Sequence, residues 1–237
     1  MKVELCVSTL EAALLAKEVG VDRIETCVNL EQGGLTPTRS MVDWIDQTLG
    51  IEQHVLIRSK AGGFTYSNFE EELMQLQIQE MRNSGAKGVV VGVLTQDKNI
   101  KCETLRRWMK NSENLDFTFH RAFDHVPNWK QAIDELVDLG FKRILTSGSV
   151  LSVNEGIERI ESMVSYASNR IEIMAGGGVS VQNIPKLVFA KVNAIHFSGT
   201  EKQIVEQDTA FEENLMLPNK EKIELLKATI QQSQKLI

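Results

Sequence analysis

Apolar and polar residues alternate in a regular way along the whole chain. Short apolar runs, each the length of a buried strand, are followed by amphipathic stretches with helical periodicity. We count eight such cycles, and the predicted strands cover residues 2–7, 23–28, 54–58, 88–94, 116–120, 143–147, 171–174 and 193–198. This alternation is typical of βα units that build a parallel sheet.

A glycine phrase recurs before every second predicted strand, at Gly20, Gly85 and Gly140. The recurrence indicates a two-unit block repeated around a ring. Eight βα units in a chain of this length predict a single-domain (β/α)8 TIM barrel over residues 1–237. A doubly wound open sheet is the alternative fold, but no Gly-x-Gly-x-x-Gly phrase follows the first strand, so a dinucleotide site there would lack its fingerprint.

Composition places the chain among ordinary globular proteins. Of its 237 residues, 42% are hydrophobic and 24% charged, which excludes disordered and low-complexity classes. A net charge of −6 leaves no basic surplus, so a nucleic acid or an anionic membrane is not an expected partner. Glu4 stands where a signal peptide would carry its apolar core, and no apolar run is long enough to span a membrane. We therefore expect a cytoplasmic protein without structural disulfides.

The alternation within each strand separates residues that face the helices from those that face the barrel interior. In the fourth and sixth strands the assignment is ambiguous. A barrel interior ordinarily holds branched aliphatic residues, so buried charges there indicate either a site or a structural network in which Arg58 balances Glu4, Glu25 and Glu172. The residues predicted to face inward are Glu4, Cys6, Glu25, Cys27, Leu56, Arg58, Thr118, His120, Glu172, Met174, His196 and Ser198.

Two cysteines stand out because of their position. Cys6 and Cys27 lie late in the first two predicted strands, and neighbouring strands are about 4.8 Å apart. Two thiols so placed could bind a soft metal such as Cu(I) or close a disulfide. Met174 or a histidine is a candidate third ligand. The histidines lack the spacing of a zinc site, which argues against a zinc enzyme.

A second group of residues suggests an anion site at the same end of the barrel. Gly177 and Gly178 follow the seventh strand, where barrels hold phosphate with backbone N–H groups. Candidate anion-binding residues are Arg58, Arg121, Gly177, Gly178, His196 and Ser198, and candidate acid–base residues are Glu4, Glu25, His120 and Asp124. The stretch 199–217, acidic through Glu201, Glu206, Asp208, Glu212 and Glu213, is expected to form a lid, a solvated loop or an oligomer contact.

Several phrases together resemble the CutC family of copper homeostasis proteins. The resemblance implies a cytosolic barrel, often a homo-oligomer, that handles copper, with Cys6 and Cys27 as its ligands and no established enzymatic activity. The chain departs from the family at Thr26, at Ser59 and Lys60, and at Ser149. The matching phrases are Glu4-Leu5-Cys6-Val7, Asp22-Arg23-Ile24-Glu25-Thr26-Cys27, Gly33-Gly34-Leu35-Thr36-Pro37, Phe119-His120-Arg121-Ala122-Phe123-Asp124, Arg143-Ile144-Leu145-Thr146-Ser147-Gly148, Ile173-Met174-Ala175-Gly176-Gly177-Gly178-Val179 and His196-Phe197-Ser198.

Two functional hypotheses follow from these observations. The first is a copper homeostasis protein that binds Cu(I) through Cys6 and Cys27 at the barrel mouth. The second is a TIM-barrel enzyme that acts on a small anionic or phosphorylated substrate, with Arg58 and the glycine loop holding the anion and Glu4 or Glu25 with His120 performing acid–base chemistry. No lysine lies late in a strand and faces inward, so a Schiff-base aldolase is disfavoured.

Overall fold

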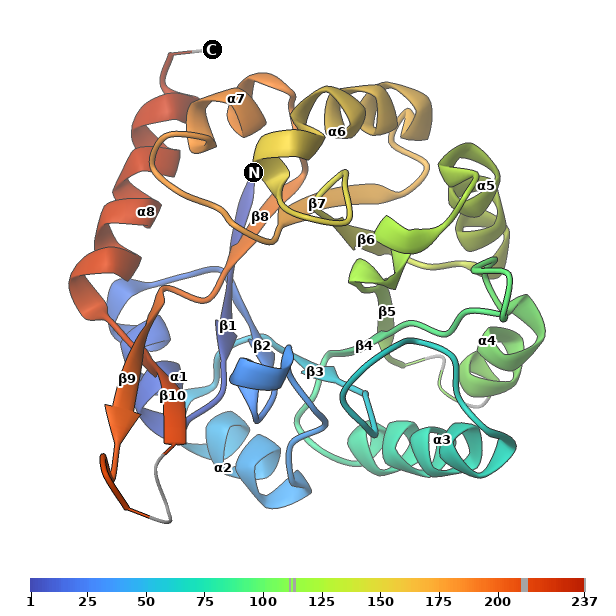
Figure 1. Cartoon of the computed structure of the whole chain (residues 1–237), viewed down its shortest axis with the longest axis horizontal. Helices are drawn as coiled ribbons and strands as arrows, with labels where there is room; N and C mark the ends of the chain where they lie inside the picture. The colour runs from blue at the N-terminus through green and yellow to red at the C-terminus, as the bar shows by residue number, and fades with distance from the viewer. Residues whose placement is uncertain (111, 113, 210–212, 237) are drawn as a thin grey trace.

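The computed structural model describes residues 1–110, 112, 114–209 and 213–236. Eight parallel strands close into a barrel in chain order, and helices surround it (Figure 1). The barrel strands are β1 Lys2–Val7, β2 Arg23–Thr26, β3 Gln53–Leu56, β4 Gly88–Val91, β5 Asp116–Phe119, β6 Arg143–Thr146, β7 Glu172–Gly176 and β8 Ala194–Phe197. The helices are α1 Leu10–Val19, α2 Arg39–Leu49, α3 Asn68–Arg82, α4 Cys102–Met109, α5 Trp129–Leu139, α6 Val153–Ala167, α7 Ile184–Phe189 and α8 Lys220–Gln234, with 3-10 turns η1 Leu30–Gln32 and η2 Arg121–His125. The predicted TIM barrel is confirmed.

Strand register sets which side chains meet inside the barrel. β1 pairs with β2 on one side and with β8 on the other, so the first and last barrel strands close the sheet. In this register Cys6 lies beside Glu25, and Glu4 lies between Arg23 and His196. Residues far apart in the chain therefore share one height in the barrel.

The hydrophobic residues of the barrel form an outer and an inner layer. The outer core packs one face of each strand, including Leu5, Ile24 and Ile173, against the helices. Two small clusters fill part of the interior: Cys6, Cys27, Leu56 and Val90 form one, and Leu145, Met174 and Ala194 form the other. Cys6, Cys27, Leu56 and Met174 therefore face inward, as predicted. In the two strands whose assignment was ambiguous, Val90 and Leu145 face inward.

The buried charges pair differently from the predicted network. Arg23, not Arg58, forms the ion pair with Glu4, and both side chains are buried. Arg143 Nε donates to Glu172 at 3.0 Å. Arg58 contacts no carboxylate within the described residues and donates instead to backbone carbonyls of the mouth loops. The network with Arg58 at its centre was therefore wrong, because the first residues of β2 and β6 supply the balancing charges.

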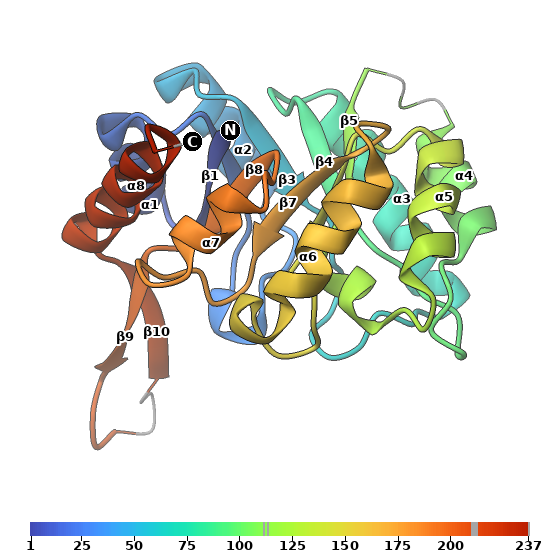
Figure 2. The same ribbon diagram turned by 90° about the horizontal axis from the view of Figure 1, so that it is seen from above.

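The stretch after β8 is more regular than the sequence suggested. Thr200–Val205 (β9) and Glu213–Pro218 (β10) pair as an antiparallel hairpin that extends from the barrel beside its mouth, not across it (Figures 1 and 2). Only the base of the hairpin, through Thr200 and Met216, lines the mouth pocket. Glu212, part of the acidic stretch, lies outside the described residues. None of the helices in the described ranges is long and apolar enough to cross a membrane.

Candidate functional site

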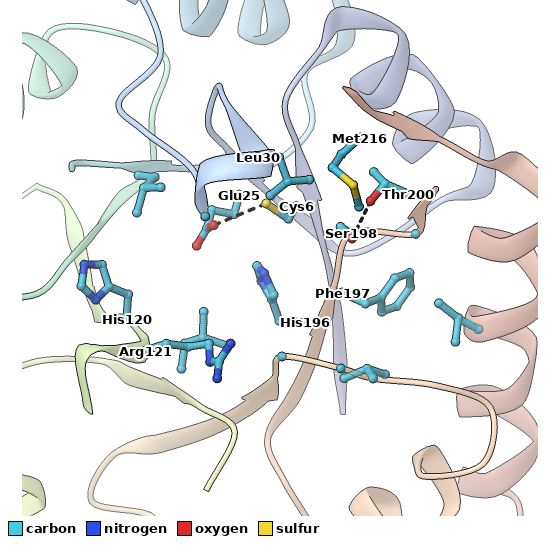
Figure 3. A pocket seen from close by; sticks show the side chains of 18 of the residues that line it. Cys6, Glu25, Leu30, His120, Arg121, His196, Phe197, Ser198, Thr200 and Met216 are labelled. Atoms are coloured by element: carbon cyan, nitrogen blue, oxygen red, sulfur yellow. Dashed lines mark hydrogen bonds between the residues drawn. The ribbon is translucent and has the colours of Figure 1, made fainter. Parts of the chain in front are cut away.

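A pocket of about 380 Å³ opens where the barrel strands end (Figure 3). Strand ends meet there because all eight strands are parallel, so late strand residues converge on one mouth. Of the predicted site residues, Cys6, Glu25, Arg58, His120, Arg121, Gly177, Gly178, His196 and Ser198 line it. Glu4, Cys27 and Asp124 do not line the pocket and lie behind its wall.

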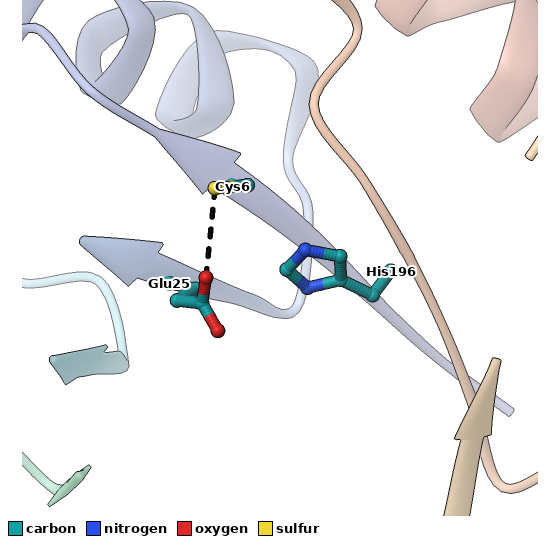
Figure 4. Close-up of side chains that lie close together, drawn as sticks. All are labelled: Cys6, Glu25 and His196. Atoms are coloured by element: carbon teal, nitrogen blue, oxygen red, sulfur yellow. Dashed lines mark hydrogen bonds between the residues drawn. The ribbon is translucent and has the colours of Figure 1, made fainter. Parts of the chain in front are cut away.

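The two predicted cysteines are in contact. Cys6 Sγ lies 3.6 Å from Cys27 Sγ. It also lies 3.6 Å from Glu25 Oε1 (Figure 4). The hydrogen bond with Cys27, then burial, then the charges of Cys27 and Glu25 raise the pKa of the Cys6 thiol well above its usual value. A metal ion that bound this thiol as a thiolate would therefore displace a proton.

A cluster of metal-type donors surrounds Cys6. One donor atom each from Cys6, Glu25 and His196 lies within 4.8 Å of the others (Figure 4). Two metal–sulfur bonds of about 2.3 Å, the length found in zinc thiolates, span sulfur atoms up to about 4.6 Å apart, so one ion can touch both cysteines. Met174, the other proposed third ligand, accepts from Arg23 Nη2 at 3.6 Å and is buried outside the pocket lining. His196 is thus better placed than Met174 to be the third ligand.

The buried carboxylate of Glu4 contacts the imidazole ring of His196. His196 Nδ1 lies 2.7 Å from Glu4 Oε1, and Arg23 Nε donates to the other carboxylate oxygen. Burial raises the pKa of Glu4, but the hydrogen bond and charge of His196 and the charge of Arg23 outweigh it and hold this pKa far below its usual value. Burial lowers the pKa of His196, and the charges of Glu25 and Glu4 more than offset this, so the net shift is upward. The arrangement favours an ionised Glu4 beneath a protonated His196.

His120 has one nitrogen bonded and the other without a partner. Its Nδ1 accepts the backbone N–H of Ala122 at 3.1 Å, while its buried Nε2 has no hydrogen-bond partner within the described residues. Burial and then the charge of Arg58 lower the pKa of His120 to about 3. A neutral imidazole that accepts at Nδ1 carries its proton at Nε2, so we assign this tautomer from the hydrogen bond. This geometry favours a donor role over the predicted acid–base role.

Gly92, which follows β4, has no side chain, and the imidazole ring of His120 occupies the space that a side chain there would fill. A Cβ built at Gly92 would lie 2.2 Å from His120 Cε1, far closer than two carbon atoms can approach. Any side chain at this position would push the imidazole out of its present orientation. The sequence pattern gave no indication of this contact.

Arg58 organises the mouth loops. Its Nη1 donates to the carbonyls of Gln32 at 2.9 Å and Gly34 at 2.8 Å, and its Nη2 donates to Gly62 at 2.8 Å. These bonds tie the loop after β2 to the loop after β3. Most of the guanidinium is therefore occupied by protein carbonyls, which leaves little of it for the predicted anion.

Arg121 and Asp124 form a second mouth cluster. Arg121 Nε donates to Asp124 at 2.8 Å, and its Nη2 donates to Ser147 Oγ at 3.0 Å. Asp124 also accepts from the hydroxyl of Thr146 at 2.5 Å and from the backbone N–H of Ser147, so this carboxylate anchors the loop after β6. Gly177 has a φ of +95°, and a Cβ there would lie 2.7 Å from Arg121 Cζ, so the guanidinium rests directly on this glycine.

Part of the pocket wall comes from beyond the barrel strands. The predicted Ser198 has its Oγ 3.0 Å from Thr200 Oγ1, and Met216 reaches the same region from β10 (Figure 3). Lys222 and Leu226 of α8 also line the pocket. No local signal in the sequence marks Met216, Lys222 and Leu226, because they follow the last barrel strand and reach the mouth only through the hairpin and α8.

Comparison with known proteins gives one family. The sequence pattern described as the CutC family matches residues 1–201. A protein named CutC in Glaesserella parasuis is 39% identical over 200 residues, covering 84% of this chain and 82% of that protein. The human "copper homeostasis protein cutC homolog" is 39% identical over 185 residues, covering 78% of this chain and 68% of the human protein.

Solved structures agree with this result. The CutC structure from Streptococcus agalactiae superposes with a TM-score of 0.78 at 34% identity, covering 83% of this chain and 98% of that chain. A thiamine phosphate pyrophosphorylase from Pyrococcus furiosus superposes with a TM-score of 0.62 at 14% identity, covering 98% of this chain and 96% of that chain. At such low identity this second likeness shows the barrel fold alone.

Proposed function

The chain belongs to the CutC copper homeostasis family, and from this premise we propose that it binds Cu(I) through Cys6 and Cys27 in the cytoplasm. The observation that carries the proposal is the 3.6 Å separation of the two Sγ atoms beside the mouth pocket. Cys6 lines the pocket and Cys27 is buried behind it, so an ion that enters from the mouth meets Cys6 first.

The surroundings of the thiols favour a soft, singly charged ion. Both sulfur atoms pack in a small apolar cluster with Leu56 and Val90. Thiolate ligands select Cu(I) over hard cations such as Mg²⁺ or Ca²⁺, which need several oxygen ligands. His196 and Glu25 supply a nitrogen and an oxygen near Cys6, and His196 would have to lose its proton to bind a metal.

The proposal is tested by titrating Cu(I) into reduced protein under anaerobic conditions, in competition with a Cu(I) chelator. We expect one tight equivalent in the wild type and its loss in both Cys6→Ser and Cys27→Ser. Cys102→Ser is the matched control, because Cys102 begins α4 and belongs to neither the pocket nor the thiol pair. Equal affinity in the wild type and the Cys6→Ser/Cys27→Ser double variant would refute the site.

A further inference from the structure

The wall of the mouth pocket that carries His120 and Arg121 has polar atoms that the protein itself does not use. We propose that this wall binds the oxyanion group of a small organic anion, with His120 Nε2–H and the Arg121 guanidinium as donors. This site lies across the barrel from the proposed copper ligands Cys6 and Cys27, because β5, which His120 follows, is opposite β1 and β2 in the closed barrel (Figure 1).

Missing hydrogen bonds are the first observation. His120 lines the pocket, and its buried Nε2 has no partner within the described residues. Leaving such a group unpaired costs free energy, so folded proteins rarely do it without a ligand or water at the site. Arg121 commits Nε and Nη2 to Asp124, Ser147 and Leu151, but no hydrogen bond of its Nη1 exists in the described part of the chain.

The chemistry of these donors selects the ligand. His120 accepts from Ala122 at Nδ1, so Nε2 can only donate while the ring stays neutral. Arg121 lines the same pocket and is held in place by three acceptors and by the backbone of Gly177. A fixed guanidinium and a fixed N–H donor in one pocket match an acceptor-rich, negatively charged group, and arginine is well suited to carboxylate and phosphate oxygens.

The balance of charge in the pocket also favours an anion. Leaving His196 aside, the charged side chains that line it are Arg58, Arg121, Lys222 and Glu25. Three cationic groups thus stand against a single carboxylate. The lining therefore carries a net positive charge, which attracts anions into the mouth.

The size and walls of the pocket limit the rest of the ligand. Its volume of about 380 Å³ equals roughly a dozen water molecules at about 30 Å³ each, which fits a small metabolite. Leu56, Phe64, Leu145 and Val179 provide apolar contacts for a carbon body. Ser198 and Thr200 offer hydroxyl groups on the side of the pocket near β8. We therefore assign the ligand to small organic phosphates or carboxylates.

The test uses the metal-free, reduced full-length chain and two probes, 2-phosphoglycolate and inorganic phosphate. Binding is measured by calorimetry, and the His120 imidazole is followed by NMR of protein labelled with ¹⁵N at histidine. We expect 2-phosphoglycolate to bind more tightly than phosphate and to shift the Nε2–H resonance of His120. Tighter or equal binding of inorganic phosphate would show a phosphate site without an organic subsite and would contradict the proposal.

Matched variants separate the site from non-specific attraction. Arg121→Gln and His120→Gln should each weaken 2-phosphoglycolate binding about tenfold, while Arg121→Lys should lose less because it keeps the charge. Arg170→Gln is the control, since Arg170 pairs with Asp134 outside the pocket and should bind as the wild type does. Thermal unfolding of each variant identifies any loss of binding that comes from misfolding.

Two results would overturn the proposal. One is the absence of heat and of any His120 shift in the wild type at probe concentrations on the order of 10 mM. The other is unchanged affinity in well-folded Arg121→Gln and His120→Gln. The Cys6→Ser/Cys27→Ser variant keeps the two proposals distinct, because it should lose Cu(I) and still bind 2-phosphoglycolate.

Discussion

Buried charged and polar groups lie both at the mouth of the barrel interior and at the end opposite the mouth, here called the floor. The two regions differ in whether these groups have partners. On the floor, Arg23 pairs with Glu4, and Arg143 pairs with Glu172. Arg23 Nη1 and His54 Nε2, which lack hydrogen bonds, still lie 3.5 and 3.6 Å from Glu52 Oε1. At the mouth, His120 Nε2 and Glu25 Oε2 are buried with neither kind of partner in the described chain.

The comparison shows which buried charges indicate a site. Polar residues inside a barrel are unusual, yet those of the floor satisfy one another and need no ligand. The mouth keeps donors and acceptors unpaired around an open pocket, which is the arrangement of a binding site. Buried charge alone is thus a weak indication of function, and a buried polar group without a partner is a stronger one.

The largest effect is expected from breaking an ion pair of the floor. Arg23→Met should lower the free energy of unfolding by about 3–5 kcal/mol, because it removes the arginine partner of the buried Glu4 carboxylate and leaves His196 as its remaining partner. Urea unfolding measures this loss. The double variant Glu4→Gln/Arg23→Met should recover part of it, since it also removes the buried carboxylate that the single variant deprives of Arg23. A loss below about 1 kcal/mol in the single variant would show that the floor pairing is not needed.

A second test adds a side chain at Gly92, where the wall of the mouth is tightly packed against His120. Gly92→Ala should cost about 1–3 kcal/mol of stability, because its Cβ would overlap His120. It should also displace the imidazole, which histidine NMR would detect. Gly63→Ala is the control, since a Cβ at Gly63 meets no atom within 4 Å. Equal stability of the two variants would contradict the tight contact between Gly92 and the ring.

The third test uses pH. His120 has a pKa of about 3 in the folded protein and an ordinary value near 6.5 in the unfolded chain. Between these values the unfolded state binds more protons, so stability rises with pH by up to about 1.4 kcal/mol per pH unit. His120→Gln should remove this slope between pH 4 and 6. Parallel stability curves for the two proteins would show that His120 titrates normally.

The smallest effect is expected at Glu25. Burial raises its pKa, so ionising Glu25 costs more in the folded protein than in the unfolded chain, and the ionised group lowers stability at neutral pH. Glu25→Gln removes the charge and should leave stability at pH 7.5 unchanged or raise it by up to about 1 kcal/mol. Urea unfolding at that pH gives the answer. A clear loss of stability would mean that Glu25 Oε2 has a stabilising partner, and the contrast with Glu4 would fail.

The fold and much of the site could be predicted because both depend on local patterns. Strand alternation alone placed Cys6, Glu25 and His120 inside the barrel, and the register of β1 and β2 then brought Cys6 beside Glu25. The pairing of the charges could not be read in this way. It depends on how far each residue lies along the barrel axis, and Arg23 begins its strand whereas Arg58 lies beyond the end of its own.

Features that depend on loop conformation could not be predicted from the sequence either. The tautomer of His120 depends on the turn that brings the Ala122 N–H onto Nδ1, and the use of Arg58 depends on where the carbonyls of two loops point. The hairpin after β8 was expected as an irregular stretch, because its polar, acidic sequence lacks the alternation of a half-buried strand. Met216 and Lys222 consequently reached the pocket unpredicted.

The bond between Glu4 and His196 joins residues 192 positions apart in the chain. At about 5–20 residues per second, a ribosome needs roughly 10–40 s to make the intervening segment. During that interval β1 has no β8 to pair with, and one of the two partners of the Glu4 carboxylate does not yet exist. The nascent chain must keep this edge strand out of other pairings until its final fifth emerges, so protection during translation is part of what this barrel requires.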